Sequence, residues 1–221
     1  MKIEFFHKGI SWLVTLLTPV VLVLAGVRLL LTPTFLQVEY NLPGFPADQY
    51  GFTKEDRLYW SGIALEYLLN SQGIEFLSNL EFEDGSPVYN ERELRHMVDV
   101  KIVVKNVLSI WYVILGLLIL LGVWAWFGKW GDSFLRGVSR GGWLTGILLG
   151  TAILLVLLSF GVFFVGFHQV FFEQGTWTFL YSDTLIRLFP ERFWRDTFLF
   201  IGIFAGGCGF LLGYFVRRKD L

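Results

Sequence analysis

Four apolar stretches, separated by polar segments, dominate the pattern of this 221-residue chain. They cover about residues 10–31, 103–127, 142–167 and 197–216, and each is close to the roughly 20 residues with which an α-helix crosses a hydrocarbon core of about 30 Å. The pattern predicts an all-α membrane protein. Its four transmembrane helices are expected to form a single membrane domain that covers residues 1–221.

The first polar segment, residues 32–102, carries helix start signals of its own. Thr53 precedes a run of acidic residues, which is typical of an N-cap, and predicts a helix that continues to about Asn70. Asn90 is the expected N-cap of a helix that begins at Glu91 and continues without a break into the second apolar stretch. We therefore expect this segment to form a helical extracytoplasmic cap on the membrane surface.

The opening of the cap, residues 33–51, is expected to be irregular. Pro33, Pro43 and Pro46 rule out a long helix there, because proline lacks the backbone N–H and restricts the residue before it. A short helix is predicted over residues 73–80.

Glycines recur at four-residue spacing in the third and fourth apolar stretches. Such rows of small residues allow helix backbones to approach closely in a membrane. The rows contain Gly142, Gly146 and Gly150, and the pairs Gly202/Gly206 and Gly209/Gly213.

Basic residues indicate the orientation in the membrane. They gather in the short segments on one side of the predicted bundle: Lys2, Lys8, Lys129, Arg136, Arg140, Arg217, Arg218 and Lys219. Because cytoplasmic loops are enriched in Lys and Arg, both termini are predicted to be cytoplasmic and the protein to be a multi-pass component of the cell (inner) membrane. The cap and the second polar segment, residues 168–196, then lie outside. The first apolar stretch is expected to be retained, since it is longer than the apolar region of a signal peptide.

Composition narrows the possible chemistry. The chain is 54% hydrophobic and 18% aromatic with a net charge of −1, and it contains no basic, aromatic-interleaved groove for nucleic acid. Cys208 is the single cysteine, so an intramolecular disulfide and a cysteine-based metal site are both excluded. A metal site would need a third ligand beside the two histidines at the predicted outer face, His96 and His168, and the sequence singles out none. Neither a metal nor another cofactor is therefore expected.

Two of the three histidines, His96 and His168, lie where a predicted span meets the outer face. Imidazole accepts and donates protons near neutral pH, so the pair could act as acid and base at one acyl-transfer or hydrolysis site. Asp99 follows His96 by three residues on the same helical face and is a candidate to fix its tautomer. The alternative interpretation is two unlinked structural histidines.

Other polar and aromatic residues are candidate lipid or substrate contacts. They are Arg28, Tyr40, Trp177 and Asp183, although for Arg28 the preferred interpretation is a side chain that extends to the lipid headgroups. The aromatic run over residues 160–179 is interpreted as lipid-facing and core packing, or as the wall of an acyl-chain groove. No nucleophile-elbow, phosphate-loop or His-Glu-x-x-His motif occurs. An acyl acceptor is therefore expected to come from the substrate.

Motifs around the two histidines also carry a family resemblance. They are His-Met-Val-Asp-Val-Lys at residues 96–101, Phe-His-Gln-Val-Phe-Phe at 167–172, Trp-Thr-Phe at 177–179, Thr-Leu-Ile at 184–186, Phe-Pro-Glu-Arg-Phe-Trp at 189–194, and the Tyr67, Leu68 and Asn70 positions of a Tyr-Leu-Asn signature. With the four-span order, they resemble the bacterial lipoprotein intramolecular transacylase (Lit) family and its integral-membrane relatives. The resemblance covers nearly the whole chain.

The resemblance implies a reaction at the outer leaflet. A diacylglyceryl-cysteine lipoprotein would pass its sn-2 acyl chain to its own α-amine, and the essential histidines of the family match His96 and His168. The implied partner is a membrane lipid or lipoprotein substrate. In the family Asp-Pro follows the Trp-x-Phe motif, whereas Leu180 and Tyr181 follow Phe179 here. If that aspartate orients a histidine or shapes the groove, the fold would persist without the activity.

Two other functions are compatible with the pattern. The chain could be a non-catalytic accessory subunit whose glycine faces and aromatic residues pack against a larger photosynthetic or respiratory membrane complex. A lipid or peptide hydrolase at the same histidines would instead release a free fatty acid or a cleaved peptide.

Overall fold

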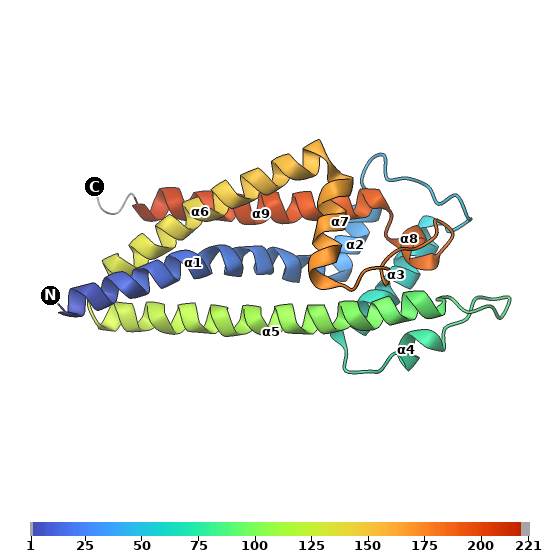
Figure 1. The fold of residues 1–221 in the computed structure, drawn as a ribbon, viewed down its shortest axis with the longest axis horizontal. Helices are drawn as coiled ribbons and strands as arrows, with labels where there is room; N and C mark the ends of the chain where they lie inside the picture. Colours follow the sequence, from blue (N-terminus) through green and yellow to red (C-terminus); the bar gives the residue numbers. More distant parts are fainter. Residues whose placement is uncertain (1, 218–221) are drawn as a thin grey trace. The chain divides into compact units, whose positions relative to one another are not determined.

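The computed structural model describes residues 2–217, and the described residues are helical with no β-strand (Figure 1). The helices are α1 (Lys2–Leu30), α2 (Pro33–Tyr40), α3 (Lys54–Leu69), α4 (Glu75–Ser78), α5 (Glu91–Phe127), α6 (Gly131–Leu158), α7 (Phe160–Phe171), α8 (Thr184–Leu188) and α9 (Glu191–Arg217). They divide into two compact units. The first contains α1 up to Arg28, Leu108–Leu158, and α9 from Phe198, and the second contains Leu29–Val107 and Ser159–Thr197.

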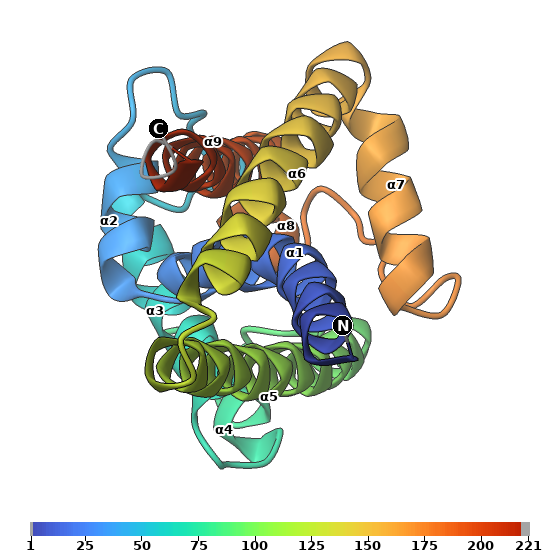
Figure 2. The same cartoon turned by 90° about the vertical axis from the view of Figure 1, so that its left-hand side faces the viewer.

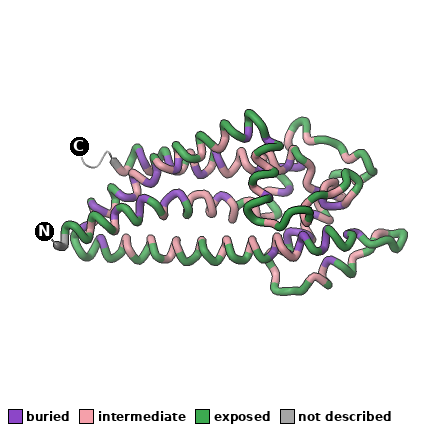
Figure 3. Tube along the Cα trace, viewed as in Figure 1, coloured by how far each residue is buried: buried purple, intermediate pink, exposed green. Residues whose placement is uncertain are grey.

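Four helices are long and apolar enough to cross a membrane, namely α1, α5, α6 and α9. Large apolar side chains on them face outward: Val113 is 70% exposed, Trp126 79% and Phe127 80%. In Figure 3 the apolar part of α5 accordingly shows mainly exposed and intermediate positions. The outward-facing apolar side chains are those that contact lipid in a bilayer, and the predicted all-α class with four transmembrane helices is confirmed.

In the first unit, α6 packs against both α1 and α9 at glycines (Figure 2). A Cβ atom at Gly142 would lie 2.7 Å from the backbone nitrogen of Gly213, and one at Gly209 would lie 2.7 Å from the carbonyl oxygen of Gly142. On the α1 side, a Cβ atom at Gly141 would lie 2.9 Å from the carbonyl oxygen of Thr15. The backbones are in direct contact, as the glycine spacing predicts.

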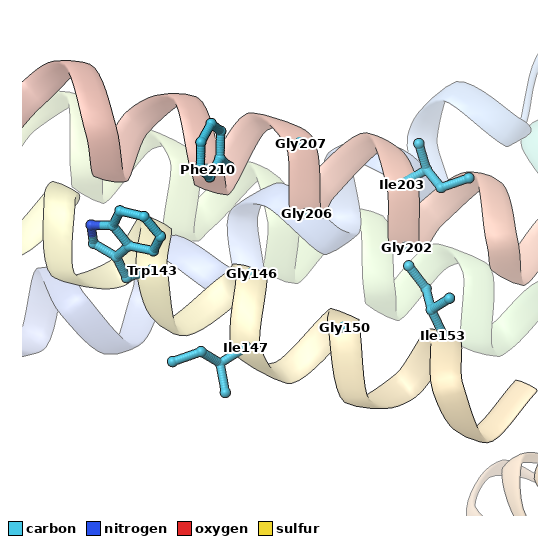
Figure 4. Close-up of a pocket in the computed structure, with 10 residues that line it drawn as sticks. All are labelled: Trp143, Gly146, Ile147, Gly150, Ile153, Gly202, Ile203, Gly206, Gly207 and Phe210. Carbon is cyan, nitrogen blue, oxygen red and sulfur yellow. The ribbon is translucent and has the colours of Figure 1, made fainter.

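The other glycines of the α6 row have a different environment. A Cβ atom at Gly146 or at Gly150 would meet no neighbouring atom within 4 Å. Both glycines line an apolar groove of about 400 Å³ between α6 and α9, closed at its ends by Trp143, Phe210 and Ile153 (Figure 4). Close contact is therefore confined to one end of the glycine row.

The second unit begins with α2, where the sequence pattern predicts irregular backbone. That prediction is wrong for Pro33–Tyr40. Pro33 occupies the first position of the helix, where a missing N–H costs nothing, and the Thr32 side chain accepts a hydrogen bond from the N–H of Phe35. Pro43 and Pro46 lie beyond the end of the helix.

Two predicted N-caps of this unit are confirmed. Thr53 caps α3 through a capping box, in which its hydroxyl accepts from the Asp56 N–H at 3.1 Å and the Asp56 carboxylate accepts from the Thr53 N–H at 2.8 Å. Asn90 caps α5, since its side-chain oxygen accepts from the N–H groups of Arg92 and Glu93.

A continuous apolar core holds the second unit together. It buries side chains of α3, α4, α5, α8 and the turn before α5: Ala64, Tyr67, Leu77, Val88, Tyr89, Leu94, Met97, Leu185 and Leu188. Burying one large apolar side chain contributes about 1.5–3 kcal/mol, so this core explains why the segment between spans is folded. At its edge, buried Arg57 donates hydrogen bonds to the carbonyl oxygens of Arg187 and Pro46.

The apolar stretch over residues 142–167 is not one helix. Helix α6 begins at Gly131 and ends at Leu158, and α7 begins at Phe160. Ser159 between them has φ −159° and ψ 83°, which is outside the helical region. Hydropathy does not reveal this break, because the residues on both sides of it are apolar.

Candidate active site

The two outer histidines lie together in the second unit. His96 is on α5 and His168 is on α7, and their ring centroids are 6.4 Å apart with an interplanar angle of 22°. Both are buried, at 9% and 7% exposure. The two rings are close enough for one bound substrate to contact both.

A buried carboxylate fixes the start of α5 against α8. Glu93 is 1% exposed, and its two oxygens accept hydrogen bonds from the N–H of Asn90 at 2.8 Å and of Leu185 at 2.6 Å. The Thr184 hydroxyl donates to the carbonyl oxygen of Val88 at 2.6 Å. The bonds that involve Leu185 and Thr184 join α8 to the start of α5 and the turn before it, so the helix that carries His96 is held at its first turn.

The loop before α8 is attached to the same turn through Asp183. Its carboxylate accepts hydrogen bonds from the Arg92 guanidinium at 2.8 Å, the Leu180 N–H at 2.9 Å and the Asn90 side chain at 3.1 Å. The Arg92 guanidinium also lies 5.7 Å from the centroid of the Phe179 ring. Asp183 thereby fixes the loop segment that begins with Phe179.

Aromatic rings surround His96. The Phe179 centroid is 5.3 Å from that of His96, and the Phe172 centroid is 4.9 Å from it, both in edge-on geometry. His96 Nδ1 is buried and has no hydrogen-bond partner among the described residues. An unpartnered buried nitrogen is unusual in a folded protein and indicates a group that is satisfied by a ligand or by chemistry.

His168 has a defined tautomer. Its Nδ1 lies 2.8 Å from the carbonyl oxygen of Phe164, one turn earlier in α7. A carbonyl oxygen can only accept, so Nδ1 carries the proton and Nε2 keeps its lone pair. Burial lowers the pKa of His168, against the opposing effect of the Phe164 bond, so the ring is neutral near pH 7. The arrangement is that of a base whose acceptor nitrogen is predetermined.

The other residues predicted for the site have different surroundings. Trp177 packs against His168 in a tilted arrangement, with ring centroids 4.8 Å apart. Asp99 lies on α5, and it does not bond His96 Nδ1. Tyr40 is buried in the cap, where its hydroxyl donates to the carbonyl oxygen of Leu188 at 2.8 Å. Arg28 ends the α1 portion of the first unit, whereas both histidines belong to the second.

Sequence reasoning missed several residues that build the site. Glu93 stands three positions after Asn90, the spacing of a capping box, and that signal could have identified one of its two bonds. Phe172 and Phe179 belong to the aromatic run but carry no sequence signal for contact with His96. Among the described residues, no group of three or more His, Cys, Asp or Glu side chains is placed to hold a metal ion.

Fold and site together define a membrane-integral helical protein with a buried, aromatic-enclosed pair of imidazoles. The family model for the lipoprotein intramolecular transacylase Lit matches residues 11–194. The chain therefore belongs to the Lit family, and the resemblance inferred from its histidine motifs is confirmed.

Individual proteins are also similar to this chain. An uncharacterized protein of Aquifex aeolicus (strain VF5) is 31% identical over 217 residues, which covers 95% of this chain and 92% of the relative. The membrane-integral Lit of Bacillus cereus shares the fold, with a TM-score of 0.75 at 19% identity over 96% of this chain and 98% of that one. A variant of the same protein with a histidine-to-alanine substitution has a TM-score of 0.63 at 21% identity, over 98% of each chain.

Proposed function

We propose that the protein transfers an acyl group within a diacylglyceryl-cysteine lipoprotein, from the sn-2 ester to the α-amine of the same molecule. Membership of the Lit family supports the reaction class. The paired, buried imidazoles support the location of the chemistry at His96 and His168. Because the nucleophile belongs to the substrate, the protein needs no nucleophilic side chain of its own.

The observation that carries the proposal is the hydrogen bond from His168 Nδ1 to the Phe164 carbonyl oxygen. It leaves Nε2 as the acceptor for a proton of the attacking amine, and the same bond stabilises the imidazolium that forms. The α-amine has an ordinary pKa of about 7.7–8.0, so part of it is neutral and nucleophilic near pH 7. His168 is thus the proposed general base.

The bond changes balance without a further reactant. The amine nitrogen bonds to the ester carbonyl carbon and loses a proton to His168. The bond between that carbon and the glyceryl oxygen then breaks, and the imidazolium returns the proton to this oxygen. Amine and ester are tethered in one molecule, and such tethering supplies effective concentrations of up to about 10⁵–10⁸ M in well-oriented systems.

His96 is the proposed second member of the acid/base pair. A neutral imidazole carries one N–H, which would donate to the ester carbonyl oxygen and polarise it for attack. Asp99, one helical turn further along α5, is the proposed orienter of this ring before the ester binds, when its carboxylate would accept a hydrogen bond from that same N–H. Arg28, Tyr40, Trp177 and Asp183 are the proposed lipid and substrate contacts.

We place this chemistry at the extracytoplasmic face of the cell membrane. In the first unit, the start of α1, the turn between α5 and α6, and the last described residues of α9 lie at one end (Figure 1). That turn contains Lys129, and Arg136 and Arg140 follow in α6. Basic residues mark the cytoplasmic side. His96 lies near the start of α5, and Lys129 follows the end of the same helix.

The test uses the purified protein in lipid nanodiscs with a synthetic diacylglyceryl-cysteine peptide. Intramolecular transfer leaves the total mass unchanged, so the product is identified by tandem mass spectrometry, in which the N-terminal fragment ions gain the acyl mass. We expect His96→Ala and His168→Ala to abolish this product. His7→Ala is the matched control, because His7 stacks on Trp130 in the first unit and belongs to no part of the proposed site.

The same measurement separates the alternatives. A hydrolase would lower the mass of the peptide by one acyl chain and release free fatty acid. Full N-acylation by both histidine variants would overturn the proposed site. Absence of any product from the unaltered protein, together with a stable complex with other membrane subunits, would favour an accessory role.

A further inference from the structure

One donor beside the imidazole pair has no role in the acid/base scheme. The Nε1 atom of Trp177 is buried, and it has no hydrogen-bond partner among the described residues. An indole N–H can only donate, and a buried donor without an acceptor costs about 1–3 kcal/mol. The site therefore contains an unfilled position for a hydrogen-bond acceptor.

That position is adjacent to the proposed base. The Trp177 and His168 ring centroids are 4.8 Å apart, and the ring planes are inclined by 38°. Nδ1 of His168 is occupied by Phe164, so the acceptor missing at Trp177 is not supplied by that nitrogen. The attacking amine, whose proton the base accepts, bonds to the ester carbonyl carbon, and this carbon lies only about 1.2 Å from its oxygen. One substrate can therefore place the amine at His168 and the carbonyl oxygen at Trp177.

The loop holds the indole in place before a substrate arrives. Gly175 has φ 90°, in the region that favours glycine, and turns the chain just before Trp177. The N–H and the hydroxyl of Thr176 both donate to the Glu173 carbonyl oxygen, at 3.3 and 2.9 Å. At the other end of the loop, Asp183 binds Leu180 and Arg92. A donor fixed in this way needs little reorganisation when charge develops on a substrate oxygen.

We infer that the indole N–H of Trp177 donates a hydrogen bond to the oxygen of the substrate acyl carbonyl, and stabilises the negative charge that this oxygen acquires in the tetrahedral intermediate. This inference rests on the proposed acyl transfer. It makes Trp177 a catalytic residue that contacts the reacting carbonyl, and not only a wall of the acyl groove. The ligand class is an ester or amide carbonyl, or an anionic mimic of its tetrahedral intermediate.

The test removes the N–H and keeps an aromatic ring. Trp177→Phe should lower kcat by about 100- to 1,000-fold, the usual loss for one oxyanion donor. Because this hydrogen bond is much stronger to the charged oxygen than to the neutral carbonyl, its loss should act mainly on kcat, and KM should change by less than about threefold. Trp130→Phe is the matched control, because Trp130 Nε1 is also buried and unpartnered but lies beside His7. This control should keep the rate of the unaltered protein.

A binding measurement covers the case in which Trp177→Phe fails to fold. In the unaltered protein, the ¹⁵N–¹H indole resonance of Trp177 should move downfield when a diacylglyceryl peptide with a phosphonate at the sn-2 position binds. The Trp130 resonance should stay in place. A folded Trp177→Phe variant with an unchanged kcat, or an unmoved Trp177 resonance at saturation, overturns the inference.

The experiments distinguish a wrong role for Trp177 from a wrong proposed function. If His168→Ala abolishes N-acylation and Trp177→Phe does not slow it, only the role of Trp177 is wrong. If the histidine variants keep full activity, the proposed function itself is wrong.

Discussion

Asp183 accepts a hydrogen bond at 2.8 Å from the guanidinium of Arg92, and this bond joins the loop before α8 to the first turn of α5. The Asp183 side chain is 10% exposed and that of Arg92 45%, so the carboxylate is the more enclosed partner. The Phe179 ring is close to both the guanidinium, 5.7 Å from its centroid, and the His96 imidazole, whose centroid is 5.3 Å away. The ion pair between Arg92 and Asp183 can therefore influence the position of the His96 imidazole through the Phe179 ring.

Replacing Asp183 should slow acyl transfer without unfolding the protein. Asp183→Ala releases the Leu180 N–H and Arg92, so Phe179 no longer holds the His96 ring, and small displacements of reacting groups cost about 10- to 100-fold in rate. Arg92→Ala should act in the same direction. Arg195→Ala is the control, since its side chain is 42% exposed and pairs with Asp196 on α9. Equal rates for Arg92→Ala and Arg195→Ala in the peptide assay would contradict the role of this ion pair.

A buried carboxyl group should make stability depend on pH. Glu39 on α2 is 2% exposed, and its Oε1 has no hydrogen-bond partner within the part of the chain that the structure describes. Burial together with the nearby Asp196 raises the pKa of Glu39 to about 7. The folded state then binds more protons than the unfolded state between pH 4.5 and 7, so stability falls as the pH rises through this window. At about 1.4 kcal/mol per pKa unit, the loss is of the order of 3 kcal/mol.

Glu39→Gln should remove this dependence. The amide keeps the shape of the side chain and cannot ionise, so the variant should be more stable than the unaltered protein at pH 8 and similar to it at pH 4.5. Thermal unfolding in detergent across this pH range measures the difference. Glu55→Gln, an exposed position on α3, is the control and should follow the unaltered protein. Parallel curves for the Glu39→Gln variant and the unaltered protein would show that Glu39 does not titrate in the window.

Two glycines of one row in α6 should respond oppositely to alanine. Gly142→Ala places a methyl group 2.7 Å from the backbone nitrogen of Gly213, and such overpacking costs about 1–3 kcal/mol. Gly146→Ala meets no atom within 4 Å, and should be neutral or stabilise the helix by about 0.5–1 kcal/mol. Unfolding of both variants in the same detergent provides the comparison. Equal destabilisation would mean that α6 and α9 are not in backbone contact at Gly142.

Features set by neighbouring residues could be predicted from the sequence. The apolar lengths predicted the four membrane helices, and the polar residues Thr53 and Asn90 marked helix starts because their caps bond the first turn. Each of these inferences depends on a short, continuous piece of sequence.

Features that depend on distant residues could not be predicted. Phe172 and Phe179 were part of an undifferentiated aromatic run, and only the folded chain places them against His96 on another element. The acceptor role of Glu93 toward Leu185 joins residues far apart in sequence, and no local pattern encodes it. Helix α2 was missed for a local reason, since the prolines were counted without regard to Pro33 standing at the first helical position.

The hydrogen bond from His168 to Phe164 lies within a single turn of α7. The direction of the imidazole is thus specified by five consecutive residues, and does not require the correct arrangement of any other segment. Substitutions in the loops that contact the substrate can change which acyl chains are accepted while the proton acceptor keeps its tautomer. The proposed base is therefore encoded locally, on a short helix of its own, and evolution can retain it while the rest of the site diverges.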